Sequence, residues 1–420
     1  MSIKKKDKNY IWHPFTQMKN SPPPTFITTG KGTLLFDENK KSYIDAISSW
    51  WVNIHGHTNP YISNKIIEQS KKLDQIIFAN FTHEPAVLLC EKLTKILPKN
   101  QKKFFFSGDG SSAIEIALKM CIQFWINKGE KKTKFIAIEG GYHGETFGAM
   151  SAGGRSIFNQ PYSDFLFETE YIPLPKNENK TIDRLKKIIL KNKIAGFIFE
   201  PLIQGASGMR CYSKSILDKI IEICKNNDII CVADEVMTGF GRTGTNFAVD
   251  QINNNPDIIC LSKSLSGGTI PISLTTCTQK IYDTFLDDKI EKAFLHGHSY
   301  TANPLGCAAS IASIELLLSK ECKTNIKKIN NCHIDFINSI NNSKKFKNIK
   351  SVGTILRFQI DNVSKNYSSK KNIEIQKFFL EKGILLRPIR DVMYLMPPYC
   401  ITEKELNQVY NAFEAFIKIQ

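Results

Sequence analysis

The sequence contains few arginines. Only seven of its 56 basic residues are Arg, and the other basic positions are Lys. The lysines form small scattered clusters, and no stripe of basic residues alternates with aromatic residues that would stack on bases. The net charge of +16 therefore indicates a solvated, lysine-rich surface, and we expect no nucleic-acid partner.

The sequence also lacks long apolar runs and paired cysteines. No stretch approaches the ~18 apolar residues of a membrane-spanning helix, and no apolar segment follows the basic start MSIKKKDKNYIW. The cysteines number eleven, an odd count, and include no C-x-x-C pair, which argues against a disulfide framework. We therefore expect a cytoplasmic protein without membrane association or a secretory signal.

Metal-binding patterns are weak. Two H-x-H pairs occur, His55/His57 and His296/His298. Neither pair has a carboxylate or thiolate nearby at the spacing of metal ligands, so the sequence predicts no metal site.

The pattern of apolar residues predicts an α/β protein. A chain of 420 residues with 42% hydrophobic residues suits a large domain plus a smaller one. Helical stretches alternate with short apolar strands in the middle of the chain, which favours βαβ units and a mostly parallel central sheet flanked by helices. We predict an N-terminal arm that forms part of the small domain (1–60), a large domain (61–310) and a smaller α+β domain (311–420).

A candidate phosphate site lies in FFFSGDGSSAIEIALKM, where an apolar strand leads into Gly110, Ser111 and a helix. Free N–H groups at a helix start bind phosphate. The string also matches G-x-G-x-x-A, but a dinucleotide fold requires an acid ending the next strand about 20 residues on. Here that distance falls in a Lys-rich turn around Glu130, so we predict phosphate binding without NAD.

Three further residues follow apolar strands. Asp234 ends IICVAD, Lys263 follows DIICLS, and Tyr142 follows KFIAIEG. Taken alone, Asp234 suits a cap or salt bridge, Lys263 a surface lysine and Tyr142 a core aromatic. Together, a phosphate cradle, a buried acid and a desolvated lysine are what pyridoxal phosphate requires: an anchor, a partner for the pyridine nitrogen and a Schiff-base amine. Tyr142 would stack on the flat ring.

The chain resembles the class III aminotransferases of pyridoxal-phosphate fold type I. ADEVMTGFGRTG and the Lys263 segment mark the class. The subgroup that aminates 8-amino-7-oxononanoate is marked by WHPFTQM, SSWWVNIHGH, GGYHGETFGAMS, HGHSYTANP and RPIRDVMYLMPPY. The similarity covers almost the whole chain.

The resemblance implies roles for the cofactor residues. Lys263 would form the Schiff base with pyridoxal phosphate and then move the proton, while Asp234 would keep the pyridine nitrogen protonated. Gly110 and Ser111 would bind the phosphate, and Tyr142 would stack on the ring.

The resemblance also implies an obligate homodimer with shared active sites. His298 and Ser299 would reach the phosphate from the partner subunit, and Gly297 would lie near the substrate.

The substrate residues implied by the family are aromatic and cationic. Arg387 would hold the substrate carboxylate through a bidentate fork that Lys does not reproduce. Trp50 and Trp51 would form an aromatic wall, and Arg242 would support the site. Phe15 would lie near the acceptor where many members carry Tyr.

Glu145 stands where Asp is usual in the family. Glu at position 145 and Phe at position 15 would change substrate recognition and would leave Lys263 and Asp234 unaffected.

The implied reaction is a ping-pong transamination of biotin biosynthesis. S-adenosyl-L-methionine would donate its amino group to the cofactor, which would then aminate 8-amino-7-oxononanoate to 7,8-diaminononanoate. The aromatic wall favours this donor because it suits a sulfonium and an adenine. Alternatives are lysine as donor, another class III ω-aminotransferase, and a nucleic-acid-binding protein on an inactive scaffold.

Overall fold

The computed structural model describes residues 2–340, 346–360 and 370–419. Its centre is a seven-stranded sheet in the order β4-β12-β11-β10-β7-β5-β6. The strands are β4 (Gln101–Ser107), β5 (Lys134–Ile138), β6 (Thr169–Ile172), β7 (Ile194–Phe199), β10 (Ile230–Asp234), β11 (Ile258–Leu261) and β12 (Ser273–Thr278). Strands β11, β10, β7, β5 and β6 pair in parallel, and β12 is antiparallel to both neighbours. The predicted α/β fold with a mostly parallel sheet is confirmed.

Helices cover both faces of this sheet, which explains why β7, β11 and, up to its terminal Asp234, β10 consist of apolar residues. All residues of β7, β10 and β11 are buried. The surrounding helices are α4 (Glu84–Ile96), α5 (Gly110–Asn127), α6 (Phe147–Ala152), α7 (Glu178–Lys191), α8 (Lys214–Asn226), α9 (Gln279–Asp283) and α10 (Pro304–Leu318). Side chains of α5 form one apolar cluster with the sheet, and those of α4, α7, α8 and α10 belong to the other.

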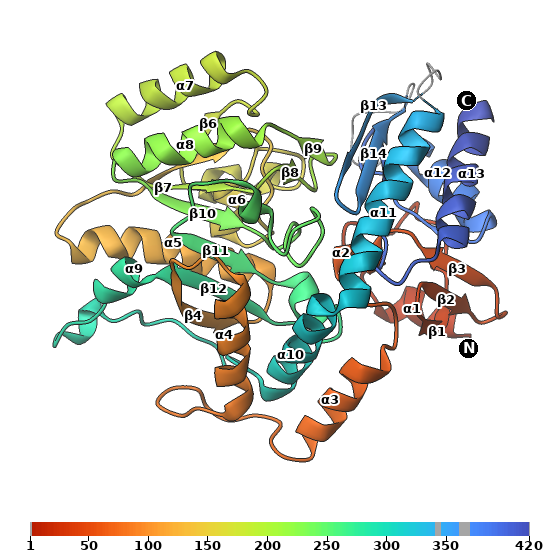
Figure 1. Cartoon of the computed structure of the whole chain (residues 1–420), viewed down its shortest axis with the longest axis horizontal. Helices are drawn as coiled ribbons and strands as arrows, with labels where there is room; N and C mark the ends of the chain where they lie inside the picture. Colours follow the sequence, from red (N-terminus) through yellow and green to blue (C-terminus); the bar gives the residue numbers. More distant parts are fainter. Residues whose placement is uncertain (1, 341–345, 361–369, 420) are drawn as a thin grey trace.

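Two smaller sheets lie beside the large one, where Figure 1 shows the red N-terminal strands next to the blue C-terminal elements. One has the order β1-β2-β3-β15, with β1 (Ile27–Lys31), β2 (Leu34–Asp37), β3 (Ser42–Asp45) and β15 (Ile384–Leu385). The other has the order β13-β14-β16, with β13 (Lys347–Val352), β14 (Ile355–Gln359) and β16 (Val392–Leu395). The parallel pairing of β3 with β15 joins the two ends of the chain.

The remaining elements connect these sheets. They are α1 (Ile3–Tyr10), α2 (Ser48–Trp51), α3 (Pro60–Ser70), β8 (Ile203–Gln204), β9 (Arg210–Cys211), α11 (Lys320–Ser339), α12 (Lys370–Glu381) and α13 (Glu403–Ile419), together with short 3-10 turns. None of the helices in the described ranges is long and apolar enough to cross a membrane.

The topology brings the predicted chemistry to one edge of the large sheet. Strands β4, β5, β10 and β11 run in the same direction, so their carboxyl ends meet there. Ligands of open α/β sheets bind at this edge.

Candidate active site

A cavity of about 590 Å³ lies at the carboxyl ends of these strands. It is lined by all five cofactor-binding residues predicted within a single chain: Gly110, Ser111, Tyr142, Asp234 and Lys263. Phe15 and Trp51 also line it, together with Glu145 and Glu200. Residues separated by more than 100 positions along the chain therefore face one space.

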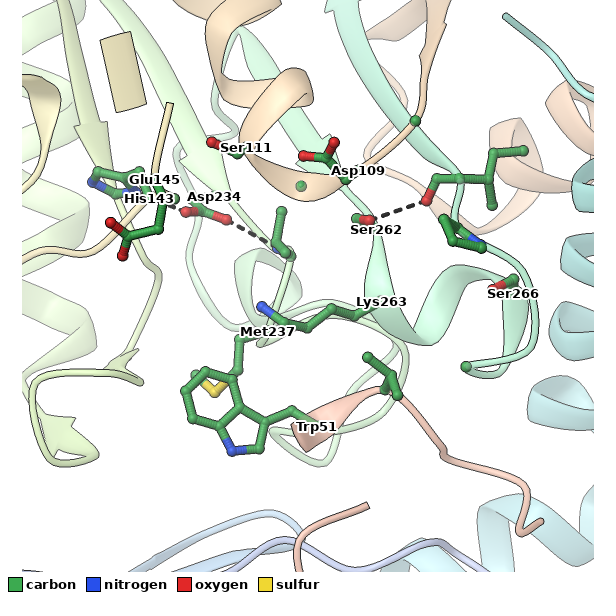
Figure 2. A pocket seen from close by; sticks show the side chains of 18 of the residues that line it. Trp51, Asp109, Ser111, His143, Glu145, Asp234, Met237, Ser262, Lys263 and Ser266 are labelled. Atoms are coloured by element: carbon green, nitrogen blue, oxygen red, sulfur yellow. Dashed lines mark hydrogen bonds and ion pairs between the residues drawn. The ribbon is translucent and has the colours of Figure 1, made fainter. Parts of the chain in front are cut away.

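Lys263 lies two residues after the end of β11 and takes a left-handed backbone conformation with φ of 47°. Figure 2 shows its side chain extending into the cavity between Trp51 and Asp234, and its Nζ lies 5.2 Å from the centroid of the Trp51 ring. Desolvation lowers the pKa of the Lys263 amine, and the negative charges of Asp234 and Glu200 offset part of this effect. A lowered pKa increases the fraction of neutral, nucleophilic amine.

Asp234 ends β10 and is buried. Its Oδ2 lies 2.7 Å from Nδ1 of the buried His143, and its Oδ1 accepts a hydrogen bond of 3.1 Å from the Val236 N–H. The carboxylate is therefore held from two directions. Sequence reasoning did not single out His143, although this residue directly follows Tyr142 in the motif that was examined.

The phosphate cradle is the start of α5. Asp109 caps the helix by accepting a hydrogen bond of 3.0 Å from the Ser112 N–H. A Cβ atom at Gly110 would lie 2.7 Å from Cγ1 of Val236, so the close approach of the backbone at this point requires glycine. Ser111 Oγ accepts from the Thr146 N–H at 3.1 Å and lies 2.7 Å from Thr146 Oγ1. Helix N–H groups and a fixed hydroxyl fit the phosphate of the predicted cofactor.

Glu200 is a second buried acid at this edge and was also missed by the sequence reasoning. It follows β7, and its two oxygens accept hydrogen bonds from the N–H of Tyr142 at 3.0 Å and of Gly205 at 2.8 Å. Burial raises the pKa of Glu200 to about 7. Its position directly after the apolar strand IAGFIF is the same signal that identified Asp234. Glu200 therefore supports the loop that carries Tyr142.

Glu145, at the cavity wall, also has a raised pKa. Desolvation raises it, and a hydrogen bond with the Tyr142 side chain offsets part of the rise.

The predicted substrate residues form an aromatic and cationic cluster. The Phe15 ring lies 5.4 Å from the Trp50 ring, and the Arg387 guanidinium lies over Trp50 with Cζ 4.9 Å from the ring centroid. Phe15 and Trp51 line the cavity, whereas Trp50 and Arg387 do not. Arg242, buried, donates to the carbonyl oxygens of Trp51 and Pro397.

Gly297, His298 and Ser299 are exposed and do not line the cavity of their own chain. A Cβ atom built on Gly108 would lie 3.7 Å from Cε1 of His298, so this loop stays near the phosphate cradle. One chain alone therefore leaves these three residues outside its site.

The histidines of both H-x-H pairs contact other protein groups. His296 Nδ1 lies 3.0 Å from Lys119 Nζ, and His298 Nδ1 accepts a hydrogen bond of 3.2 Å from the Tyr300 N–H. His55 Nε2 lies 3.0 Å from Ser313 Oγ, and His57 Nε2 lies 2.9 Å from Asp45 Oδ2. Among the described residues there is no group of three or more His, Cys, Asp or Glu that could hold a metal ion.

Comparison with known families gives a match to the model described as "Aminotransferase class-III", which spans residues 15–417. The chain belongs to the class III aminotransferase family. The predicted family and enzyme class are thereby confirmed, since the match covers nearly the whole chain.

Several curated relatives that match along nearly the whole chain bear the same name. The adenosylmethionine-8-amino-7-oxononanoate aminotransferase of Synechococcus elongatus is 41% identical over 413 residues, which is 96% of this chain and 97% of that protein. The crystal structure of the enzyme of the same name from Methanocaldococcus jannaschii has a TM-score of 0.93 at 35% identity, and the match covers 99% of this chain and 98% of that one.

A further structural match concerns the cofactor. The PLP-bound amine transaminase from an uncultivated Pseudomonas species has a TM-score of 0.89 at 25% identity, and the match covers 97% of this chain and 98% of that one. A fold similar to that of this chain is therefore known with pyridoxal phosphate bound.

Proposed function

We propose that this chain transfers the amino group of S-adenosyl-L-methionine to 8-amino-7-oxononanoate and so forms 7,8-diaminononanoate in biotin biosynthesis. The observation that carries the proposal is the placement of the Lys263 amine, with its lowered pKa, in one cavity with Asp234 and Ser111. The names of the relatives, which match along nearly their full length, supply the choice of substrates.

Pyridoxal phosphate is the cofactor of this reaction. Gly110 and Ser111 would hold its phosphate at the start of α5, Tyr142 would stack on its ring, and Asp234 would pair with the ring nitrogen. When bound, it supplies an aldehyde that condenses with amines and a ring that withdraws electrons. His143 keeps the Asp234 carboxylate oriented through the 2.7 Å hydrogen bond.

Lys263 is the catalytic nucleophile and base. Its long side chain extends into the cavity, and its lowered pKa increases the fraction of neutral amine that can accept a proton. The Trp51 ring beneath the amine excludes water from one side. Lys263 Nζ would therefore accept and return the proton that moves during the amino transfer.

Arg387, Trp50, Trp51 and Phe15 bind the substrates. The guanidinium, already stacked on Trp50, offers a planar fork for a carboxylate. The aromatic rings provide a surface for the sulfonium and adenine of the donor.

The functional unit is a homodimer. Gly297, His298 and Ser299 are exposed beside the phosphate cradle, as expected for a loop that serves the partner's site. Large apolar side chains of the same region, Leu295 and Tyr300, are 70% and 69% exposed in the single chain, and a second copy covers them.

An absorbance scan tests the proposal. The purified protein with pyridoxal phosphate is expected to turn yellow, and addition of S-adenosyl-L-methionine alone is expected to bleach the band, because the donor half-reaction needs no acceptor. A yellow protein whose band is bleached by lysine and not by adenosylmethionine would show that lysine is the amino donor. A protein that never turns yellow would overturn the assignment of Lys263.

A further inference from the structure

The segment Ser48–Trp51 is a left-handed turn made of four residues that are not glycine. Their φ angles are 50°, 44°, 72° and 76°. Left-handed helical backbone is unfavourable for residues with a Cβ atom, because Cβ crowds the following carbonyl oxygen. A run of four such residues persists only if neighbouring groups hold it in place.

Asp45, fully buried at the end of β3, provides much of that support. Its Oδ1 accepts a hydrogen bond of 2.9 Å from the Ser49 N–H, and its Oδ2 accepts one of 2.7 Å from the Ser49 hydroxyl. The Ile47 N–H is also directed at Oδ1, at 3.4 Å. One carboxylate therefore fixes both the backbone and the side chain of Ser49.

His57 in turn fixes Asp45. Its Nε2 lies 2.9 Å from Oδ2 of Asp45, and its Nδ1 lies 3.1 Å from the side-chain amide of Asn53. The turn is held at its two ends as well, since the Ser48 hydroxyl donates to the Met396 carbonyl at 2.8 Å and Arg242 donates to the Trp51 carbonyl.

The turn presents two neighbouring indoles to different parts of the site. Trp50 lies beneath the Arg387 guanidinium, and the exposed fraction of Trp50 is 36%. Trp51 is buried, donates from Nε1 to the Tyr394 hydroxyl at 3.0 Å and lies under the Lys263 amine. Trp51 keeps these bonds when the turn relaxes, whereas the Trp50 ring would change direction and Arg387 would lose the surface on which it stacks.

We propose that Asp45 is a positioning residue for substrate binding, which acts through Ser49 and His57 to hold the left-handed turn that aims Trp50. It touches neither Lys263 nor the cavity, and Trp51 keeps its own bonds to Tyr394 and Arg242. Asp45 therefore sets how tightly substrates are bound and leaves the proton transfer unchanged. The identity of the substrates rests on the function proposed above.

The test compares Asp45→Asn with the wild-type holoenzyme. Asparagine keeps the size of the side chain but loses one of the two acceptor oxygens. We expect KM for 8-amino-7-oxononanoate to rise by about tenfold with kcat within about twofold, which is the signature of lost binding. The near-ultraviolet circular dichroism bands of the indoles should change as well, because Trp50, one of the four tryptophans, reorients.

Asp218→Asn is the matched control. Asp218, in α8, also accepts two backbone N–H bonds, from Asn253 at 3.0 Å and Asn254 at 2.7 Å. It lies away from the cavity, so its replacement should leave both KM and the indole bands unchanged. An unchanged KM in folded Asp45→Asn, or a fall in kcat at constant KM, would overturn the proposal.

Two variants of Ser49 complete the test. Ser49→Ala removes only the hydroxyl bond to Asp45, and it decides the question if Asp45→Asn does not fold: a raised KM supports the proposal and an unchanged KM contradicts it. Ser49→Gly placed in Asp45→Asn should restore part of the lost binding, because glycine adopts a φ of 44° without strain. The indole bands need no substrate, so unchanged bands in Asp45→Asn refute the positioning role even where adenosylmethionine proves inactive.

Discussion

The Nδ1 atom of His143 lies 2.7 Å from the Oδ2 atom of Asp234, and both side chains are buried. The two residues are 91 positions apart and come from different strand ends. The imidazole supplies a partner that a buried carboxylate requires, and the Val236 N–H supplies a second. Asp234 therefore keeps one orientation at the edge of the cavity.

Replacement of His143 by Asn should weaken both the fold and the activity. Loss of a partner of a buried carboxylate costs about 1–3 kcal/mol, so we expect the free energy of unfolding to fall by that amount. We also expect kcat/KM to fall by roughly 10- to 100-fold, as measured with the purified holoenzyme.

His333→Asn is the control for that variant. His333 is likewise buried, with Nδ1 2.6 Å from the Tyr410 hydroxyl and Nε2 3.1 Å from the Thr354 carbonyl, but it lies away from the cavity. The His333→Asn variant should be less stable than the wild type and should keep its specific activity. Equal activities in the two variants would contradict a role for His143 at Asp234.

The burial of His333 also predicts that the stability of the fold depends on pH. Burial lowers its pKa from 6.5 to about 4. Below pH 6.5 the unfolded chain binds a proton that the folded chain does not, so this residue makes stability fall as the pH is lowered from 6.5 to about 4, by about 3 kcal/mol in total. Urea unfolding across this range should show a shallower loss in His333→Asn, and parallel curves would contradict the prediction.

Lys263→Ala should abolish turnover and leave the fold intact. Removal of the amine takes away both the nucleophile and the base, so we expect activity to fall by at least roughly a thousandfold. Far-ultraviolet circular dichroism should match the wild type. Lys219→Ala, which removes an exposed lysine paired with Glu178 on the surface, should retain full activity. Turnover near the wild-type rate in Lys263→Ala would refute the assignment.

Arg387→Lys should raise KM and change kcat little. Lysine keeps the charge but loses the planar fork and the stacking on Trp50, so we expect KM for 8-amino-7-oxononanoate to increase by about tenfold. Arg184→Lys, at an exposed ion pair with Glu170, serves as the control with unchanged kinetics. An unchanged KM in Arg387→Lys would show that Arg387 does not bind the substrate carboxylate.

Phe15→Tyr should tighten binding of the acceptor. Phe15 lines the cavity next to Trp50, and a phenol hydroxyl there would add one hydrogen bond, worth about 0.5–1.5 kcal/mol. This corresponds to a fall in KM of roughly two- to tenfold. Phe165→Tyr, at a side chain that is 77% exposed, should leave KM unchanged. A raised KM in Phe15→Tyr would mean that the ring contacts only apolar parts of the substrate.

Much of the fold and part of the site follow from the sequence. Apolar strands alternating with helices predict the sheet, because strands covered on both faces must be apolar throughout. Polar residues directly after such strands predict the site edge, which is how Ser111, Asp234 and Lys263 were found. Their grouping in one cavity follows from the common direction of the strands.

The contacts that orient these groups came only from the tertiary structure. The His143–Asp234 pair, the support of Tyr142 by Glu200 and the left-handed turn held by Asp45 join positions whose distances depend on strand register and loop path. Local sequence patterns encode the type of each element, since periodicity is a property of neighbouring residues. Which buried acid meets which imidazole is decided by packing between segments far apart in the chain, and no local pattern records it.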